Sequence, residues 1–154
     1  MRTKSRGRSS DHHSGRVDRH RRALAIAVGN VSGTEKRFRK LLKSEGLIFG
    51  CNDPTLPGTP DLVFPREQLI VFVHGCYWHR HQDCSRSAAP AKDVAYWLST
   101  SNEQVRRDAA VNEHLREMGW EVVVAWECEI DEAPRLAVKR VVSALHTPGA
   151  HASP

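Results

Sequence analysis

The sequence predicts a single α/β domain in which helices flank a mixed central sheet. Segments with helical and strand-like patterns follow one another in the order helix, three strands, helix, strand, helix. The length of 154 residues fits one domain with one core. Hydrophobic residues make up 40% of the chain and charged residues 27%, which is typical of a soluble globular protein and excludes a disordered or membranous one.

The first part of the domain is expected to contain one helix and three strands. The helix begins near Ser32, because Ser32 and Glu35 have the spacing of a capping box, and it ends at Gly46. The strands are predicted at residues 47–49, 61–64 and 69–73. The third is expected to be central and buried, because it is continuously apolar.

The second part of the domain is expected to be mostly helical. Residues 93–118 have the pattern of one helix, or of two helices with a break at residues 99–102. Residues 121–126 are predicted to form another buried strand. Residues 134–145 are predicted to form a terminal helix, because proline is favoured at the first helical position.

Positive charge is concentrated at the amino terminus. Residues 1–22 hold eight lysines and arginines against two aspartates, whereas the rest of the chain holds 15 basic and 16 acidic residues. We therefore predict a basic disordered arm at 1–22, a folded domain at 23–145 and a frayed tail at 146–154. The arm either neutralises the phosphates of a nucleic acid or is a solvated tail.

The four cysteines indicate a metal site rather than disulfides. The apolar run at residues 23–28 is too short for a signal peptide, and no segment has the length of a membrane span, so a cytoplasmic protein is expected. Cysteines interleaved with histidines in that compartment favour zinc. One set of residues closes a tetrahedral site, and two others are substitutes: Cys76, His81, Cys84 and Cys128, with Cys51 and His79 in reserve.

A second group of residues has the pattern of a magnesium-dependent nuclease. Asp61 opens one strand of a predicted hairpin, and His74 ends the next strand. Such a layout holds Mg²⁺ against a phosphate, with Glu35 as a second candidate acid. Here an imidazole stands where such nucleases usually place a lysine. Alternatively, Asp61 is a turn residue that caps its strand.

Aromatic residues beside the histidines suggest a surface for bases. Tyr77 and Trp78 are adjacent, so in extended chain they point opposite ways and cannot easily enter one core. Either these two rings and that of Trp97 stack on bases, or all three belong to the core. Asp108 is a solvated helix charge unless it faces His79, where it would orient the imidazole.

On these residues, the chain resembles the very-short-patch-repair (Vsr) DNA mismatch endonucleases. The resemblance covers about residues 32–130 with order and spacing kept, and it implies a restriction-endonuclease-like fold. Members nick DNA 5′ to the thymine of a T:G mismatch. The landmarks that carry it are Thr34-Glu35-Lys36-Arg37, Leu56-Pro57-Gly58-Thr59-Pro60-Asp61, His74-Gly75-Cys76-Tyr77-Trp78-His79, Trp97, Arg107-Asp108, and Gly119-Trp120 to Trp126-Glu127-Cys128.

The resemblance also implies roles for particular residues. Mg²⁺ would be bound by the Asp61 carboxylate and the Val73 main-chain carbonyl. The remaining roles are a catalytic group of His74, His79 and Asp108 supported by Glu35, a structural zinc on Cys76, His81, Cys84 and Cys128, and an aromatic wedge of Tyr77, Trp78 and Trp97. The arginines of the basic arm, among them Arg19, Arg21 and Arg22, would add salt-sensitive affinity for DNA.

The sequence departs from the family's pattern in a few places. Val73 stands where threonine is usual, Gln104 replaces a usual asparagine, and one extra residue separates His81 from Cys84. The family's segment that reaches the DNA from the minor-groove side is only loosely matched by residues 19–26. The bases that flank the target could therefore differ.

From the sequence we hypothesise an Mg²⁺-dependent endonuclease with a structural zinc site that nicks mismatched duplex DNA. A monomer in the cytoplasm, associated with the nucleoid, is expected, with downstream mismatch-repair proteins as partners and no membrane association. The alternatives are a related restriction-like or defence nuclease that acts on unmismatched or modified DNA, and a zinc-bearing DNA-binding module without catalysis.

Overall fold

The computed structural model describes residues 31–147. The predicted basic arm at 1–22 and nearly all of the predicted tail at 146–154 lie outside these residues. Within residues 31–147, no helix is long and apolar enough to cross a membrane.

Four strands form the predicted mixed sheet, in the spatial order β1 (Gly50–Cys51), β2 (Leu62–Phe64), β3 (Leu69–His74) and β4 (Glu121–Trp126). β2 runs antiparallel to both β1 and β3. β4 runs parallel to β3, with Val73 opposite Ala125. A parallel pair needs a long crossover, and here the crossover contains the helix α3 (Val94–Glu117).

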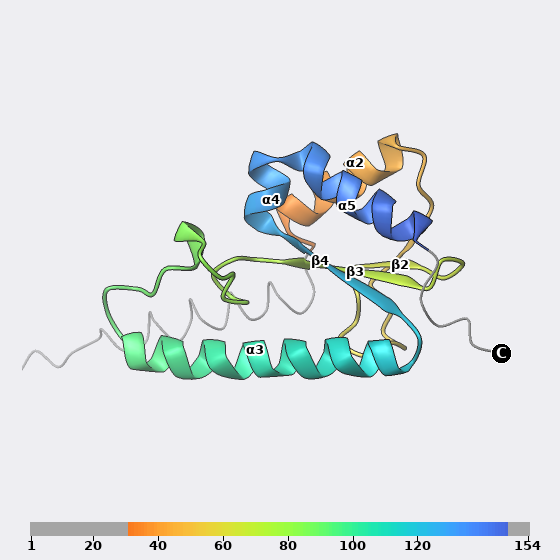
Figure 1. Ribbon diagram of the computed structural model, residues 1–154. Coiled ribbons are helices and arrows are strands. Elements are labelled where there is room, and N and C mark those ends of the chain that lie inside the picture. The colour runs from red at the N-terminus through yellow and green to blue at the C-terminus, as the bar shows by residue number, and fades with distance from the viewer. Residues whose placement is uncertain (1–30, 148–154) are drawn as a thin grey trace, which may run out of the picture. The chain divides into compact units, whose positions relative to one another are not determined.

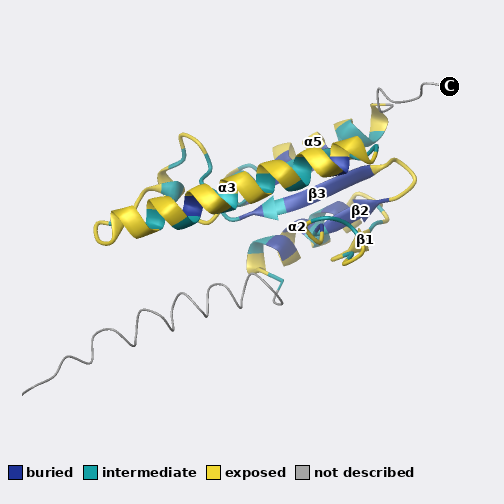
Figure 2. Cartoon of the chain, turned by 90° about the horizontal axis from the view of Figure 1, so that it is seen from below, coloured by how far each residue is buried: buried dark blue, intermediate teal, exposed yellow. Residues whose placement is uncertain are grey.

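Helices cover both faces of the sheet. α3 lies along one face, and α2 (Gly33–Ser44), α4 (Glu127–Glu132) and α5 (Pro134–His146) lie over the other (Figure 1). The central strand β3 is buried between these layers, whereas the outer side of α3 is exposed (Figure 2). The predicted central burial of this strand is therefore confirmed.

The alternation of side chains along β3 divides the core in two. Leu69 and Val71 pack with Phe38 and other residues of α2 and α5. Ile70 and Phe72 point the other way and join a smaller cluster that includes Leu115 of α3. Because His74 is two residues beyond Phe72, it belongs to the face covered by α3.

Of the two alternatives for residues 93–118, the structure has the single helix, because α3 runs unbroken through residues 99–102. The hydroxyls in that stretch bond within the helix instead of interrupting it. Thr100 Oγ1 donates to the Tyr96 carbonyl at 3.0 Å, and Ser101 Oγ donates to the Leu98 carbonyl at 3.3 Å.

Two strand predictions were wrong in detail. Residues 47–49 are not a strand, and the first strand is instead the short pair Gly50–Cys51. The strand at residues 121–126 has the predicted bounds but is not buried: only Ala125 is buried, and Glu121 is exposed. It is the outermost strand of the described sheet, so one of its edges lacks a neighbouring strand.

A short helix that the sequence analysis missed follows β4 directly. Glu129 Oε2 accepts the Trp126 backbone N–H at 3.2 Å, as the third residue of a capping box does. The chain therefore turns into α4 at Glu127. Cys128 therefore lies in the first turn of α4.

Candidate active site and zinc centre

Asp61 lies immediately before β2, at the open end of the β2–β3 hairpin. Its Oδ2 accepts the backbone N–H of Val73 at 2.7 Å. This hydrogen bond holds the carboxylate against the end of strand β3, beside the main chain of Val73. The alternative of a strand-capping turn residue does not describe this contact, because Asp61 bonds across the hairpin rather than within its own turn.

The Asp61 carboxylate is held in an environment that disfavours its charge. Burial raises the pKa of Asp61 to about 6, and the Val73 N–H only partly opposes that effect. The charge of Glu35 raises the pKa further, whereas Arg39 and His79 lower it. Among the described residues, Asp61 Oδ1 accepts no hydrogen bond. A desolvated carboxylate with one oxygen to spare fits a hard cation such as Mg²⁺.

His74 and His79, which lie outside the predicted set of zinc ligands, stack on each other. The rings of His74, at the end of β3, and His79 are 3.7 Å apart between centroids and nearly parallel, at 9°. Burial, followed by the charge of His79, lowers the pKa of His74 to about 3. His74 is therefore a neutral imidazole at physiological pH.

Asp108 faces His79, which is the arrangement in which its carboxylate would orient the imidazole. Asp108 Oδ2 lies 2.7 Å from His79 Nδ1, and Gln104 Nε2 donates to Asp108 Oδ1 at 2.8 Å. Burial raises the pKa of Asp108, but the hydrogen bond and charge of His79 outweigh it and hold the pKa below its usual value. An ionised carboxylate only accepts, so Nδ1 of His79 donates its N–H to Asp108, and in the neutral form of the ring the lone pair is on Nε2.

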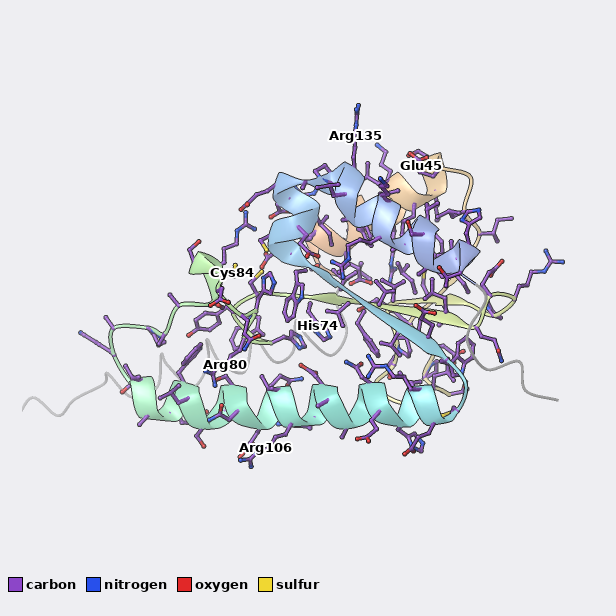
Figure 3. All side chains as sticks on the ribbon, in the orientation of Figure 1. Glu45, His74, Arg80, Cys84, Arg106 and Arg135 are labelled. Atoms are coloured by element: carbon purple, nitrogen blue, oxygen red, sulfur yellow. The ribbon has the colours of Figure 1, made fainter. Side chains whose placement is uncertain are left out.

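These residues meet from four separate parts of the chain. Ligand atoms of His74, His79 and Asp108 lie within 4.8 Å of one another, and the charge of His79 reaches Asp61. Figure 3 shows His74 between the sheet and α3, with Arg80 nearby on the α3 side. His74, His79 and Asp108 therefore form one cluster, and Asp61, which bonds to the residue before His74, lies within electrostatic range of it.

Glu35 is buried in the first turn of α2 and reaches the same site through an arginine that sequence reasoning missed. Arg39, one helical turn later, forms an ion pair with Glu35 and donates to the Asp61 carbonyl at 3.2 Å. It also donates to Asn52 Oδ1 at 3.1 Å. The spacing of Glu35 and Arg39, four residues apart on a helix, was a signal that could have found this pair.

The predicted zinc ligands converge on one point. The ligand atoms of Cys76, His81, Cys84 and Cys128 all lie within 4.8 Å of one another. His81 Nδ1 is 3.7 Å from Cys76 Sγ and 3.3 Å from Cys128 Sγ. Three thiols and one imidazole are a complete tetrahedral donor set, and they fit zinc.

The surroundings of this cluster support a structural role. Burial raises the pKa of the Cys76 thiol to about 12, so a bound cation is what would make this group a thiolate. The Cys128 N–H points at Cys76 Sγ at 3.4 Å, and the His81 ring stacks on Trp126. Cys84 lies on the loop below α4 (Figure 3).

Neither proposed substitute ligand belongs to the cluster. Cys51 is exposed on β1, and His79 is engaged with Asp108. The loop that carries Cys84 is tied to α4, because Arg86 forms ion pairs with Asp131 and Glu132.

The aromatic residues form a group beside the histidines. The Tyr77 ring lies 5.2 Å from Trp78 and 5.7 Å from Trp97, between centroids. Tyr77 and Trp78 lie in a turn rather than in extended chain, so the argument from alternating directions was wrong. Trp78 is 43% exposed, and the guanidinium of Arg80 lies 5.5 Å from the Trp97 ring.

Comparison with known proteins identifies the family. Over 130 residues the chain is 34% identical to the DNA mismatch endonuclease Vsr of Escherichia coli, which covers 84% of this chain and 82% of that protein. This chain belongs to the Vsr family. Residues 16–86 also match the family described as DNA mismatch endonuclease Vsr.

Other Vsr-like relatives are nicking enzymes by name. The chain is 39% identical over 105 residues to the type II nicking enzyme V.XorIIP of Xanthomonas oryzae, covering 68% of this chain and 76% of the relative. It is 34% identical over 96 residues to V.NmeAIP of Neisseria meningitidis, covering 62% and 68%. Arg19, Arg21 and Arg22 fall within the matched segment but outside the described residues.

Proposed function

We propose that this member of the Vsr family is an endonuclease that nicks one strand of duplex DNA 5′ to the thymine of a T:G mismatch. The observation that carries the proposal is that the buried Asp61 carboxylate lies within electrostatic range of a histidine that an aspartate orients. A cation site beside an oriented base is what phosphodiester hydrolysis requires.

The residues around Asp61 fit a divalent cation. Asp61 and the main-chain carbonyl of Val73 would hold Mg²⁺, which when bound polarises a phosphate and stabilises the leaving oxygen. The charge of Glu35 acts on Asp61 and contributes to the electrostatic field at the site. A bound cation also offsets the cost of keeping the Asp61 carboxylate ionised in a buried place.

His79 is our candidate for the general base. Its Nδ1–H is directed at Asp108, so the lone pair on Nε2 is free to accept a proton from water. As that proton leaves, the water oxygen attacks phosphorus and the bond to the leaving oxygen breaks. Asp108 stabilises the imidazolium that results.

His74 takes a different part, because it is neutral. A buried imidazole with its pKa near 3 cannot offer a positive charge to the phosphate. It can donate a hydrogen bond from one ring nitrogen to a phosphate oxygen. His74 stacks against His79, so both rings would lie beside the same phosphate.

Trp78, Tyr77 and Trp97 are proposed to enter the duplex beside the mismatch. Intercalation costs a few kcal/mol per unstacked step, and this cost is lowest where pairing is already weak. An exposed Trp78 supported by the other rings fits such a wedge. The four-ligand zinc cluster would fix the turn that carries these residues, because Cys76 and His81 flank it.

A strand-resolved nicking assay tests this function. Matched duplexes with T:G, the other mismatches and C:G at one position are incubated with the zinc-loaded protein and Mg²⁺. We expect a nick in the thymine strand of the T:G duplex and intact C:G duplex. Equal cutting of T:G and C:G would instead indicate a restriction-like or defence nuclease. Binding without nicking under every condition would indicate a DNA-binding module.

A further inference from the structure

Two of the three wedge rings, Tyr77 and Trp78, lie in a tight turn that favours glycine at one position. The His81 N–H donates to the Cys76 carbonyl at 3.0 Å, and Arg80, just before the donor, has a φ of 49°. A hydrogen bond of this span, with a left-handed residue before its donor, is the pattern of a Schellman motif, in which that residue is usually glycine. Arginine at this position is strained, because its Cβ crowds the following carbonyl.

The Arg80 side chain crosses from the turn to the long helix. Its Nη1 donates to Asn102 Oδ1, and its guanidinium lies over the Trp97 ring, 5.5 Å from the ring centroid. The Tyr77 ring lies 5.7 Å from the same indole, between centroids. A cation over an indole is attracted by the π electrons of the ring. Trp97 of α3 is therefore held by two residues of one turn, Tyr77 and Arg80.

Apart from these contacts, the first half of α3 buries little. Only Ser101 and Leu115 are buried in this helix, and Leu115 packs against the sheet from the second half. The first half lies beside the loop that follows β3 rather than beneath the sheet (Figure 1), and its Val94 and Leu98 are exposed. The buried Nε1 of Trp97 has no hydrogen-bond partner within residues 31–147. The orientation of the indole therefore depends on its contacts with the turn.

We propose that Arg80 is a positioning residue that holds the Trp97 ring against Tyr77 before DNA binds, so that the aromatic wedge is already assembled when a duplex arrives. The inference rests on the proposed function, because it assumes that these rings enter the duplex. Glycine would satisfy the turn without strain, but only a long cationic side chain reaches α3 from this position. A preassembled wedge loses less conformational entropy on insertion than rings that must first be ordered.

Replacement of Arg80 by glycine separates this role from general support of the fold. Arg80→Gly removes the guanidinium and relieves the strained backbone, so its melting temperature should equal or exceed that of the wild type. In zinc-loaded protein, an anisotropy titration should show T:G duplex binding about three- to tenfold weaker, the effect of ordering one more side chain on binding. Binding to C:G duplex should be nearly unchanged. The kcat at saturating T:G duplex should stay close to the wild type, because the bases hold the rings once they are inserted.

Variants on α3 complete the comparison. Asn102→Leu removes the acceptor of the Arg80 guanidinium and should weaken T:G binding in the same way. The double variant R80G/N102L should bind no more weakly than Arg80→Gly alone, because both changes remove the same contact. Arg106→Met is the control for the loss of a positive charge. Arg106 lies on the side of α3 that faces away from the sheet (Figure 3), so the ratio of T:G to C:G affinity should stay at its wild-type value.

Fluorine NMR of protein labelled with fluorotryptophan reports on the wedge in the absence of DNA. The chain has four tryptophans, and the Trp97 resonance is identified by its loss in Trp97→Phe. We expect one sharp Trp97 resonance in the wild type. In Arg80→Gly and Asn102→Leu this resonance should broaden or shift, because the indole samples more than one orientation. In Arg106→Met it should stay in place.

Equal losses of T:G and C:G affinity in Arg80→Gly, with Asn102→Leu unaffected, would overturn the inference and indicate a phosphate contact instead. Unchanged T:G binding in Arg80→Gly would also overturn it, as would a lower melting temperature together with a lower kcat. If Arg80→Gly does not fold, Asn102→Leu decides, because wild-type T:G affinity in that variant contradicts the proposed contact. Failure of the proposed function looks different: the wild-type protein would not nick T:G duplexes, or Trp78→Ala would bind them as well as the wild type does.

Discussion

Replacement of Asp61 by asparagine should remove nicking and, at the same time, stabilise the fold. The free carboxyl has a pKa of 3.8, and burial raises it to about 6 in the native protein. The native state therefore binds the Asp61 proton more tightly than the unfolded chain does. The contribution of Asp61 to the free energy of unfolding is therefore highest below pH 3.8, decreases as the pH rises toward 6 and is level above that value.

The magnitude follows from the size of the shift. Each pKa unit corresponds to about 1.4 kcal/mol, so ionised Asp61 costs the metal-free native protein up to about 3 kcal/mol at neutral pH. Asparagine has no charge to bury, and its Oδ1 can still accept the Val73 N–H. In Asp61→Asn the decrease between pH 4 and 6 should therefore be absent, and the variant should be the more stable form at pH 7.5.

The assay is urea unfolding of both proteins from pH 4.5 to 7.5, followed by tryptophan fluorescence. The buffer contains zinc and is prepared without Mg²⁺. No chelator is added, because a strong chelator would also remove zinc. The other titrating groups are shared, so the difference between the two curves isolates Asp61. An Asp61→Asn variant less stable than the wild type at pH 7.5, or a difference that does not change with pH, would refute the reasoning.

Three further predictions concern the zinc centre, the base and the wedge. Cys128→Ser should lose zinc by metal analysis and destabilise the chain to heat, because three ligands hold zinc less well than four; unchanged zinc content would contradict the ligand assignment. Asp108→Asn should lower kcat about 10²- to 10⁴-fold with little change in KM, the range expected for a positioned base; single-turnover nicking measures it. Trp78→Ala should weaken binding to T:G duplex by about 1–3 kcal/mol in a fluorescence anisotropy titration while leaving C:G binding nearly unchanged; equal losses on both duplexes would exclude a wedge specific to mismatches.

Local patterns in the sequence predicted most of the elements, and they failed where the sheet decides burial. The capping spacing of Ser32 and Glu35 predicted α2 almost to the residue. The apolar run at β4, by contrast, indicated a buried strand, whereas the strand is at the edge of the described sheet. A run of valines indicates that a strand packs against other apolar residues, but it does not indicate how many neighbouring strands the sheet places beside it.

The candidate site shows the same division. Metal-ligating residue types crowded between residues 74 and 84 predicted the cluster of zinc ligands, which the structure brings together. The placement of Cys128 in α4 and the contacts of Arg39 were missed. Both depend on contacts between segments far apart in the chain, Cys128 with Cys76 and Arg39 with Asp61.

The sequence alone determined which side chains are present and which local elements carry them, because helix caps, strand runs and ligand spacing depend on neighbours in the chain. Only the tertiary structure decided their ionic state and their partners. Folding removes His74 and Asp61 from water and sets charges from separate elements side by side, and those two effects shift proton equilibria that the isolated residues do not reveal.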